Sequence, residues 1–248
     1  MFKFKFISDL HLERKLKHVL FKKEQLGGIL LLAGDIGSPF KKSYWDFLQY
    51  TSDNFDKVYF ITGNHEYWNS KKYTMTDVDM MIEDKTENLK NVQFLNNDVD
   101  FINGYKIVGS TLWSYTHNHK SFNYKYTYMD DNTKLNVKEH NKLFLNNLRW
   151  IYSQLDNNHI ITPTIMLTHH IPSMSFTKID SKYIPYKSLF ASDLDHLIQY
   201  PVKSWIFGHT HDKFIRNIRG VQCGVNSWHG LVKNEYILSE IELPEIKK

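Results

Sequence analysis

Short apolar runs recur along the chain and give the clearest signal of secondary structure. The five most regular runs span Phe2–Ile7, Ile29–Ala33, Val58–Ile61, Ile165–Leu167 and Trp205–Phe207. Runs of this length that are bounded by polar or turn residues are typical of buried β-strands. We therefore expect five strands at the centre of the fold.

Stretches with a helical repeat lie between these runs. Apolar residues recur with a period of about 3.6 in Tyr44–Tyr50, Thr76–Leu89, Val137–Leu155 and Ser192–Ile198. Parallel strands need crossover connections of a dozen or more residues, which helices usually supply. Strand, helix and strand in alternation predict an α/β fold.

Further strands are expected outside the five central runs. Two are predicted at Val92–Leu95 and Tyr105–Ser110. A β-rich tail is predicted from Phe214 through Val221–Val225 to Tyr236–Leu243. We expect this tail to belong to a second sheet.

Composition narrows the class of protein. The 248 residues are 42% hydrophobic and 23% charged, which is typical of a globular chain, and no linker or repeat divides residues 1–248, so we expect a single domain. The lone Cys223 excludes an internal disulfide and a cysteine-built zinc site. With no apolar run of ~20 residues and no signal-peptide pattern, we expect a cytoplasmic protein without membrane contact. The net charge of +4 neither indicates nor forbids nucleic-acid binding.

A polar cluster rich in metal-ligand side chains follows each of the five runs. The clusters are Asp9-Leu-His11, Gly34-Asp35, Gly63-Asn64-His65-Glu66, His169-His170 and Gly208-His209-Thr210-His211. Ligands of open α/β sheets bind beyond the carboxyl ends of the strands, so we expect the five clusters to form one site.

The donor types predict two metal ions. Residues i and i+2 of an extended segment point to the same side, so Asp9 with His11 and His209 with His211 each offer two ligands. Imidazoles, carboxylates and one amide give about seven or eight ligands, which is too many for one tetrahedral ion. Two ions need a bridging carboxylate. Asp35, in a tight Gly-Asp turn, is the natural bridge.

These five clusters, in this order, resemble the motifs of the calcineurin-like metallophosphoesterase superfamily. The resemblance extends from Phe6 to at least His211. It implies a four-layer αββα sandwich in which two mixed β-sheets are flanked by helices, with a dimetal site at the carboxyl ends of the strands.

The resemblance also implies a ligand set. One ion would be held by Asp9, His11, Asp35 and His211, and the other by Asp35, Asn64, His169 and His209. Manganese is the first expectation, and iron and zinc also accept imidazole and carboxylate. His65 remains as a residue that binds neither ion.

The implied activity is that of a binuclear metal-dependent phosphoesterase, acting as a phosphodiesterase or phosphatase. A metal-bound hydroxide would attack phosphorus in line, and His65 would act as the general acid that protonates the leaving alkoxide. The expected substrates are small-molecule phosphoesters, including nucleotides.

Departures from known subfamilies narrow this assignment. Ile36-Gly37-Ser38 follows Asp35 where protein Ser/Thr phosphatases carry a carboxylate and an arginine, and where purple acid phosphatases need a tyrosine. The whole pattern is similar to a compact microbial and viral branch of predicted phosphoesterases. That branch often carries Asn-Pro-Arg-Gly where this chain has Asn226-Ser-Trp-His-Gly230.

Three alternatives to a small-molecule hydrolase stay open. A nuclease acting on DNA or RNA ends would need a basic groove beside the site. A scaffold for protein interaction would keep the fold without turnover, although His65 and the full ligand set argue against it. A structural metal protein would have closed coordination.

Other chemistry-bearing residues have weaker patterns. His170 and Glu66 are candidates for contacts to the metal shell or the substrate, or for packing. His117-Asn-His119 copies a metal-ligand spacing without a strand before it, and the loops 113–131 and 172–190 are candidates for shaping a substrate pocket. Five aromatic residues are candidates for a wall that stacks a base or packs a leaving group, although packing and loop anchoring are the expected roles: Tyr67, Trp68, Trp113, Tyr115 and Tyr124. Lys178, Lys182 and Lys187 are candidates for reaching a phosphate, although solvation is the expected role. Surface exposure is the expected role of His18, His140, His159 and His196.

Overall fold

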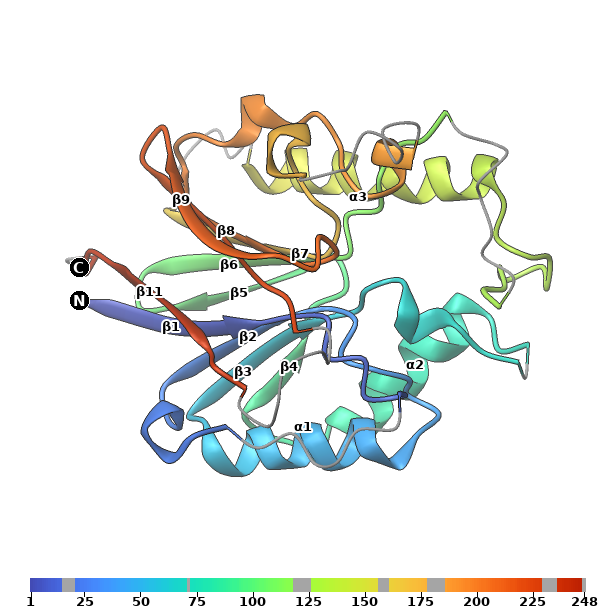
Figure 1. The fold of residues 1–248 in the computed structure, drawn as a ribbon, viewed down its shortest axis with the longest axis horizontal. Coiled ribbons are helices and arrows are strands. Elements are labelled where there is room, and N and C mark those ends of the chain that lie inside the picture. Colours follow the sequence, from blue (N-terminus) through green and yellow to red (C-terminus); the bar gives the residue numbers. More distant parts are fainter. Residues whose placement is uncertain are drawn as a thin grey trace.

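Two stacked β-sheets with helices on their outer faces make up the molecule (Figure 1). A computed structural model describes residues 1–14, 21–70, 72–117, 126–155, 161–177, 186–228 and 236–246. From one face to the other the layers are helices, sheet, sheet and helix. The predicted α/β class and four-layer sandwich are confirmed.

The first sheet has five strands in the order β11-β1-β2-β3-β4. Its strands are β1 (Phe2–Ile7), β2 (Ile29–Ala33), β3 (Lys57–Ile61), β4 (Val92–Phe94) and β11 (Ser239–Leu243). Strands β1 to β4 run parallel, and β11 pairs antiparallel with β1. The first three predicted strands therefore lie side by side.

The second sheet has six strands in the order β5-β6-β7-β8-β10-β9. Its strands are β5 (Asp98–Ile102), β6 (Tyr105–Ser110), β7 (Thr164–Thr168), β8 (Val202–Phe207), β9 (Lys213–Ile218) and β10 (Val221–Asn226). The four central strands are parallel, while the edge strands β5 and β9 are antiparallel to their neighbours.

Three α-helices among the described residues cover the outer faces of the sheets. Helices α1 (Lys42–Asn54) and α2 (Met75–Thr86) lie below the first sheet in Figure 1, and α3 (Val137–Leu155) lies above the second. Short 3₁₀ helices are η1 (Lys23–Gln25), η2 (His65–Tyr67), η3 (Met174–Phe176) and η5 (Asp195–Leu197).

Residues of one strand alternate between two separate cores. Phe6, Leu31 and Leu167 belong to the cluster between the sheets, and all three are fully buried. Leu30 belongs instead to the outer cluster, together with Leu48 of α1. A strand buried on both faces has no polar alternation, which explains why β2 appears in the sequence as one continuous apolar run.

Three expectations about secondary structure were wrong. The helix expected over Ser192–Ile198 is only the 3₁₀ turn η5, since this stretch is too short to build a packed amphipathic helix. The tail is divided: β9 and β10 join the second sheet, but β11 returns to the first and pairs with β1. Strand β5 was not expected, because two aspartates interrupt its apolar pattern.

Isolated β-bridges form within the first of the two expected loops and at the two ends of the second. Tyr128 pairs with Thr74 and with Lys134, and Ile171 pairs with Ala191. Residues 118–125 of loop 113–131 and residues 178–185 of loop 172–190 lie outside the described residues. Within the part of the chain that is described, no helix is both long enough and apolar enough to cross a lipid bilayer.

Candidate metal centre and active site

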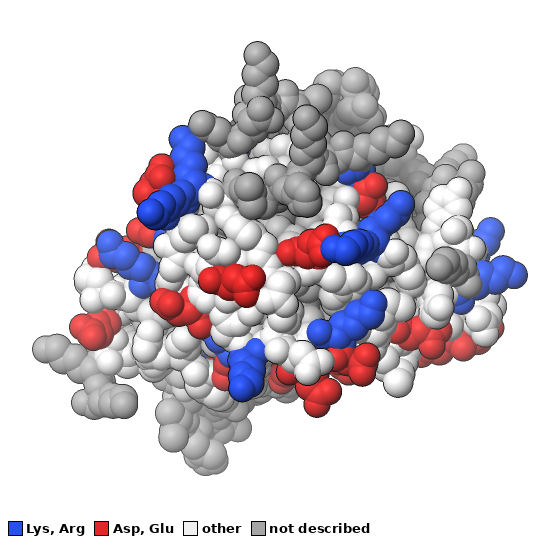
Figure 2. All heavy atoms as spheres, turned by 90° about the horizontal axis from the view of Figure 1, so that it is seen from below, with Lys and Arg blue, Asp and Glu red and all other residues white. Residues whose placement is uncertain are grey.

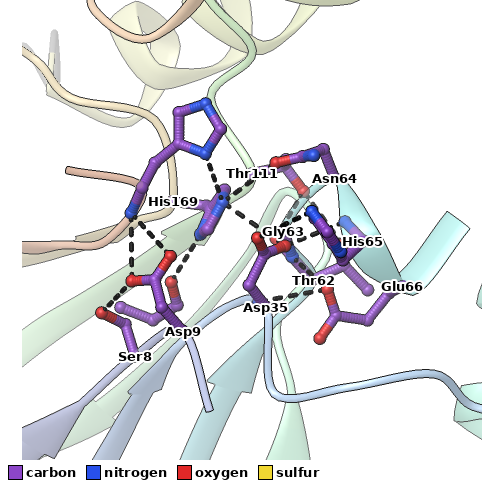
Figure 3. A network of polar contacts seen from close by, with 12 residues as sticks. Ser8, Asp9, Asp35, Thr62, Gly63, Asn64, His65, Glu66, Thr111 and His169 are labelled. Atoms are coloured by element: carbon purple, nitrogen blue, oxygen red, sulfur yellow. Dashed lines mark hydrogen bonds and ion pairs between the residues drawn. The ribbon is translucent and has the colours of Figure 1, made fainter. Parts of the chain in front are cut away.

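All seven predicted ligands lie together where strands of both sheets end. Figure 3 labels four of them, Asp9, Asp35, Asn64 and His169. The structure places Asp9 and His11 after β1, Asp35 after β2, Asn64 after β3, His169 after β7, and His209 and His211 after β8. The first sheet thus supplies the carboxylates and the amide, and the second sheet supplies most of the imidazoles. The predicted convergence of the five clusters on one crevice is confirmed.

The backbone at this site is unusual, because many of its residues adopt a left-handed conformation. Positive φ angles occur at Asp9 (55°), His11 (48°), Asp35 (52°), His209 (65°) and His211 (53°). Residues other than glycine rarely adopt φ > 0, and such residues concentrate at functional sites held in place by the surrounding structure. Sharp reversals after the strands therefore turn these side chains toward one another.

Glycines allow the loops to approach closely. A Cβ atom on Gly63 would stand 2.2 Å from Oδ1 of Asp35. A Cβ atom on Gly34, whose φ is +79°, would stand 2.7 Å from the backbone nitrogen of Gly63. Both glycines of the sequence motifs are thus required by the close contact of the loops that follow β2 and β3.

Asp9, His11 and His211 form the first cluster, in which one ligand atom from each residue lies within 4.8 Å of the others. The Asp9 carboxylate is held through Oδ2, which accepts hydrogen bonds from Ser8 Oγ (2.5 Å) and Ser227 Oγ (2.7 Å). Oδ1 lies 3.6 Å from Nε2 of His211. The two serines were not anticipated from the sequence.

The second cluster consists of Asp35, His169 and His209, again within 4.8 Å. His169 Nδ1 lies 2.9 Å from the carbonyl oxygen of Ala33, to which it donates, so that in the neutral ring Nε2 carries the lone pair. That Nε2 lies 3.3 Å from Asn64 Oδ1 and 3.2 Å from His209 Nδ1. Several acceptor atoms thus converge, and only a cation or a shared proton between them removes their mutual repulsion.

Asp35 lies between the two clusters. Its Oδ1 is 3.5 Å from Nε2 of His169, and its Oδ2 is 3.8 Å from Nε2 of His11. That His11 atom is buried without a hydrogen-bond partner among the described residues. A buried, unsatisfied imidazole nitrogen aimed at a carboxylate fits a metal ligand.

The pKa shifts of Asp35 and His169 also indicate a site that favours positive charge. Burial alone favours the neutral acid, but the nearby imidazoles of His169, His65 and His11 hold the pKa of Asp35 well below its usual value. Burial alone lowers the pKa of His169, yet the Asp35 carboxylate outweighs it and raises that pKa to about 9. A buried carboxylate that favours the protonated form of a neighbouring imidazole is one that a bound cation would also stabilise.

His65 lies beside Asp35. Its backbone N–H donates to Asp35 Oδ1 at 2.9 Å, and its ring Nε2 lies 3.9 Å from Asp35 Oδ2. The other ring nitrogen, Nδ1, lies 3.4 Å from Oε1 of Glu13. The ring stacks on Trp68 with centroids 3.8 Å apart.

Glu13 is a site residue that sequence reasoning missed. The same Oε1 atom also lies 3.1 Å from Nδ1 of His11, so one carboxylate faces both imidazoles. Burial raises the pKa of Glu13, but these two contacts outweigh it and lower the pKa to about 2. The i, i+2 repeat of ligand-type residues at Asp9, His11 and Glu13 was the signal that could have identified it, although left-handed turns at Asp9 and His11, and not an extended strand, bring the three side chains together.

Glu66 ties two loops together. Its carboxylate is fully buried and accepts backbone hydrogen bonds from Asp35 (3.1 Å), Ile36 (2.8 Å) and Gly63 (2.8 Å). Burial and the negative charge of Asp35 raise the pKa of Glu66 to about 8. These contacts favour a structural role for Glu66, in which it holds the loops of the site together, over contact with the metal shell or the substrate.

His170 is packed among rings. It is fully buried, its centroid lies 4.5 Å from that of His209 and 5.3 Å from that of Trp113, and neither ring nitrogen has a hydrogen-bond partner among the described residues. The expectation that His140 is a surface residue was wrong. His140 is fully buried and its ring meets Trp113 edge-on, because the apolar face of α3 includes this position.

The remaining singled-out residues lie away from the two clusters. Tyr67 is buried, with its hydroxyl bonded to Thr62 and Asp79, and His117 lies against Tyr115. His196 lies 2.6 Å from the hydroxyl of Tyr152. Residues that fall outside the described part of the chain are His18, His119, Tyr124, His159, Lys178, Lys182 and His229.

Comparisons with known proteins agree with this geometry. An uncharacterized protein of Acanthamoeba polyphaga mimivirus, L509, is 33% identical over 244 residues, which cover 86% of each chain. Phosphopantetheinyl hydrolase (PptH) from Mycobacterium tuberculosis has a similar fold, with a TM-score of 0.67 and 18% identity over 91% of this chain and 89% of that one.

The match to a family model spans the region that builds the site. It runs over residues 2–213, from the first strand to just beyond His211, and so contains both clusters together with His65. The family it describes is the calcineurin-like phosphoesterase. With this match, the fold and the mimivirus relative, the chain belongs to the calcineurin-like phosphoesterase family.

Proposed function

We propose that the protein hydrolyses phosphoesters at a site holding two divalent cations, with His65 as the general acid. The observation that carries the proposal is the pair of clusters Asp9, His11, His211 and Asp35, His169, His209, which lie on either side of the Asp35 carboxylate. In this assignment Asn64 completes the second set. When bound, two such cations activate water and offset charge on phosphoryl oxygens.

Asp35 has the central role among the ligands. Its two oxygens face different imidazoles, Oδ1 toward His169 and Oδ2 toward His11, so one carboxylate reaches both clusters. The backbone N–H of His65 restrains it at Oδ1. Imidazole and carboxylate donors without thiolates accept manganese, iron or zinc, and we propose manganese first.

His65 is placed to return a proton to the departing group. Water supplies the oxygen that ends on phosphorus, the bond between phosphorus and the leaving oxygen breaks, and that oxygen takes the proton from His65 Nε2. Glu13 supports this role, because Oε1 facing Nδ1 turns Nε2 toward the reaction centre. An acceptor at Nδ1 holds the proton of that nitrogen and so fixes the orientation of the ring.

The first test is metal-dependent turnover. The protein is stripped of metal, reloaded with Mn²⁺, and assayed with a chromogenic phosphodiester and the matching monoester, with bound metal measured on the same samples. We expect His65→Ala to lose roughly 10²-fold in kcat while keeping both ions. We expect Asn64→Ala to lose metal from the second set instead.

Each outcome separates the alternatives. Preference for the diester directs attention to cyclic nucleotides and nucleic acids, and preference for the monoester to nucleotides and sugar phosphates. A phosphopantetheinyl ester belongs in the panel because PptH, the fold neighbour, is named as a phosphopantetheinyl hydrolase. Two bound ions without turnover of any ester would overturn the proposal and favour a scaffold.

The nuclease alternative is not supported by the charges on the face below the first sheet. Figure 2 shows the face on the side of α1 and α2, where lysine and arginine side chains of the described residues are mixed with aspartate and glutamate. A protein that tracks a nucleic-acid backbone needs basic side chains gathered into a groove or stripe. The face in Figure 2 shows no such gathering among the described residues and so gives a nuclease no support, and we place small phosphoesters first.

A further inference from the structure

A pocket opens beside His65, and its lining includes neither Asp35 nor His169. Its volume is about 610 Å³, and its lining includes His65, Trp68, Phe40, Arg14 and Lys41. Of these residues, the sequence indicated His65 as the acid and Trp68 as a candidate for an aromatic wall, whereas Phe40, Arg14 and Lys41 were not anticipated. Pockets of several hundred Å³ with a few convergent polar groups are typical of small-molecule sites.

The position of the general acid determines which part of a substrate enters this pocket. In the proposed reaction, His65 gives its proton to the leaving oxygen, so that oxygen must lie within hydrogen-bond reach of the ring. In that reaction the phosphoryl group would lie at Asp35, which Nε2 of His65 faces, whereas Glu13, which Nδ1 faces, lines the pocket. The rest of the leaving group therefore extends into the pocket.

Two aromatic side chains form the apolar part of the pocket. Trp68 is 37% exposed although its indole stacks on His65 at 3.8 Å. Phe40 is half-buried and packs against Tyr73 with centroids 5.2 Å apart. A partly exposed indole beside a catalytic imidazole offers a flat surface on which a ring can stack.

Two cations give the pocket its charge. The side chain of Arg14 is 57% exposed, and its Nε lies 3.8 Å from Glu13, a carboxylate already engaged by the two imidazoles. Lys41 is exposed and has no ion-pair partner within the described part of the chain. It occupies the N-cap of α1, where a positive charge opposes the helix dipole, so helix stability does not account for it.

We propose that this pocket binds the leaving group and selects leaving groups that combine a flat ring with a separate anionic group. The proposal rests on the hydrolase function proposed above. Trp68 and Phe40 receive the ring, and Arg14 and Lys41 neutralise the anion. Nucleotide-like and acidic aryl leaving groups share this chemistry.

The test uses two esters that differ in one charge. The substrates are 4-nitrophenyl phosphate and 3-carboxy-4-nitrophenyl phosphate, whose phenols are of similar acidity. The variants are Arg14→Ala and Lys41→Ala, with Lys42→Ala as the matched control, because the neighbouring Lys42 pairs with Asp46 outside the pocket. The quantity compared is the ratio of kcat/KM for the two esters.

We expect the wild-type protein to prefer the carboxylated ester. Each pocket variant should reduce that preference by roughly threefold, as for a partly exposed ion pair, and Lys42→Ala should keep the wild-type ratio. An equal ratio in all four proteins, with both esters cleaved, overturns the pocket assignment and leaves the hydrolase intact. Failure to cleave either of these monoesters, in a protein that also fails to cleave the chromogenic phosphodiester, overturns the hydrolase.

A binding measurement gives a readout that is independent of turnover. Equilibrium dialysis with 5-hydroxy-2-nitrobenzoate, the free leaving group, should show weaker binding to Arg14→Ala and Lys41→Ala than to Lys42→Ala. Equal binding to all three variants contradicts the pocket assignment whether or not the esters are cleaved.

Discussion

Oε1 of Glu13 lies 3.4 Å from Nδ1 of His65, and this contact sets the direction in which the ring faces the site. The carboxylate arises from the loop after β1, whereas the imidazole arises from the turn after β3. The orientation of the proposed acid thus depends on the relative placement of two loops.

Replacing Glu13 with glutamine should slow turnover without unfolding the protein. The amide carries no charge and weakens the contact that orients the His65 ring at Nδ1, so we expect kcat to fall by roughly 10- to 100-fold. The loss should be larger for esters of weakly acidic alcohols, which depend most on the acid, than for a nitrophenyl ester. A uniform loss across leaving groups, with metal content reduced, would assign Glu13 to His11 alone.

Glu66→Gln should act on stability. Glutamine retains one acceptor oxygen and places an NH₂ group against backbone N–H donors, leaving buried groups unsatisfied. We expect the free energy of unfolding to fall by about 1–3 kcal/mol, measured by urea denaturation of the metal-free protein. Unchanged stability with lost turnover would place Glu66 in the chemistry instead.

Asp35→Asn should weaken both metal positions, because its oxygens face His169 and His11 separately. His211→Ala removes a side chain that meets only the first cluster, so it should reduce the occupancy of one position. Metal content after dialysis at limiting Mn²⁺ distinguishes these cases. Loss of a single ion from Asp35→Asn would contradict the bridging assignment.

His140 should make the protein less stable in mild acid. Burial lowers its pKa to about 4 in the folded state, against an ordinary value of 6.5, so folding favours the neutral ring. Its contribution is complete above pH 6.5 and is lost as the pH falls toward 4. Between pH 8 and pH 5 the metal-free wild type should lose about 2 kcal/mol more than His140→Phe, measured by urea unfolding. Parallel losses in both proteins would show that the ring is hydrated.

Much of the site was predictable from the sequence because its residues follow buried strands directly. The runs before Asp9, Asp35 and His169 are apolar enough to be recognised without help, and their ends lie at one edge of the sheets. The roles assigned to these residues, and the single domain over 1–248, stay predictions.

What the sequence did not reveal depends on contacts distant along the chain. Ser227 reaches Asp9 from 218 positions away, and nothing in its local pattern marks it. Lys41 and Arg14 look like ordinary solvated residues until the loops after β1 and β2 bring them beside Trp68. The return of β11 to β1 is likewise a tertiary choice, since its alternating residues fit an edge strand of either sheet.

The pairing of β11 with β1 determines when the first sheet can be completed during synthesis. Among the strands of the first sheet, β1 is made before its partner β11, with β2, β3 and β4 between them, so one edge of β1 stays open until residues 239–243 have left the ribosome. Asp9 and His11 follow directly after that same strand. Until then the nascent chain carries an unpaired strand edge next to an incomplete set of proposed metal ligands. The pairing of β11 completes the first sheet.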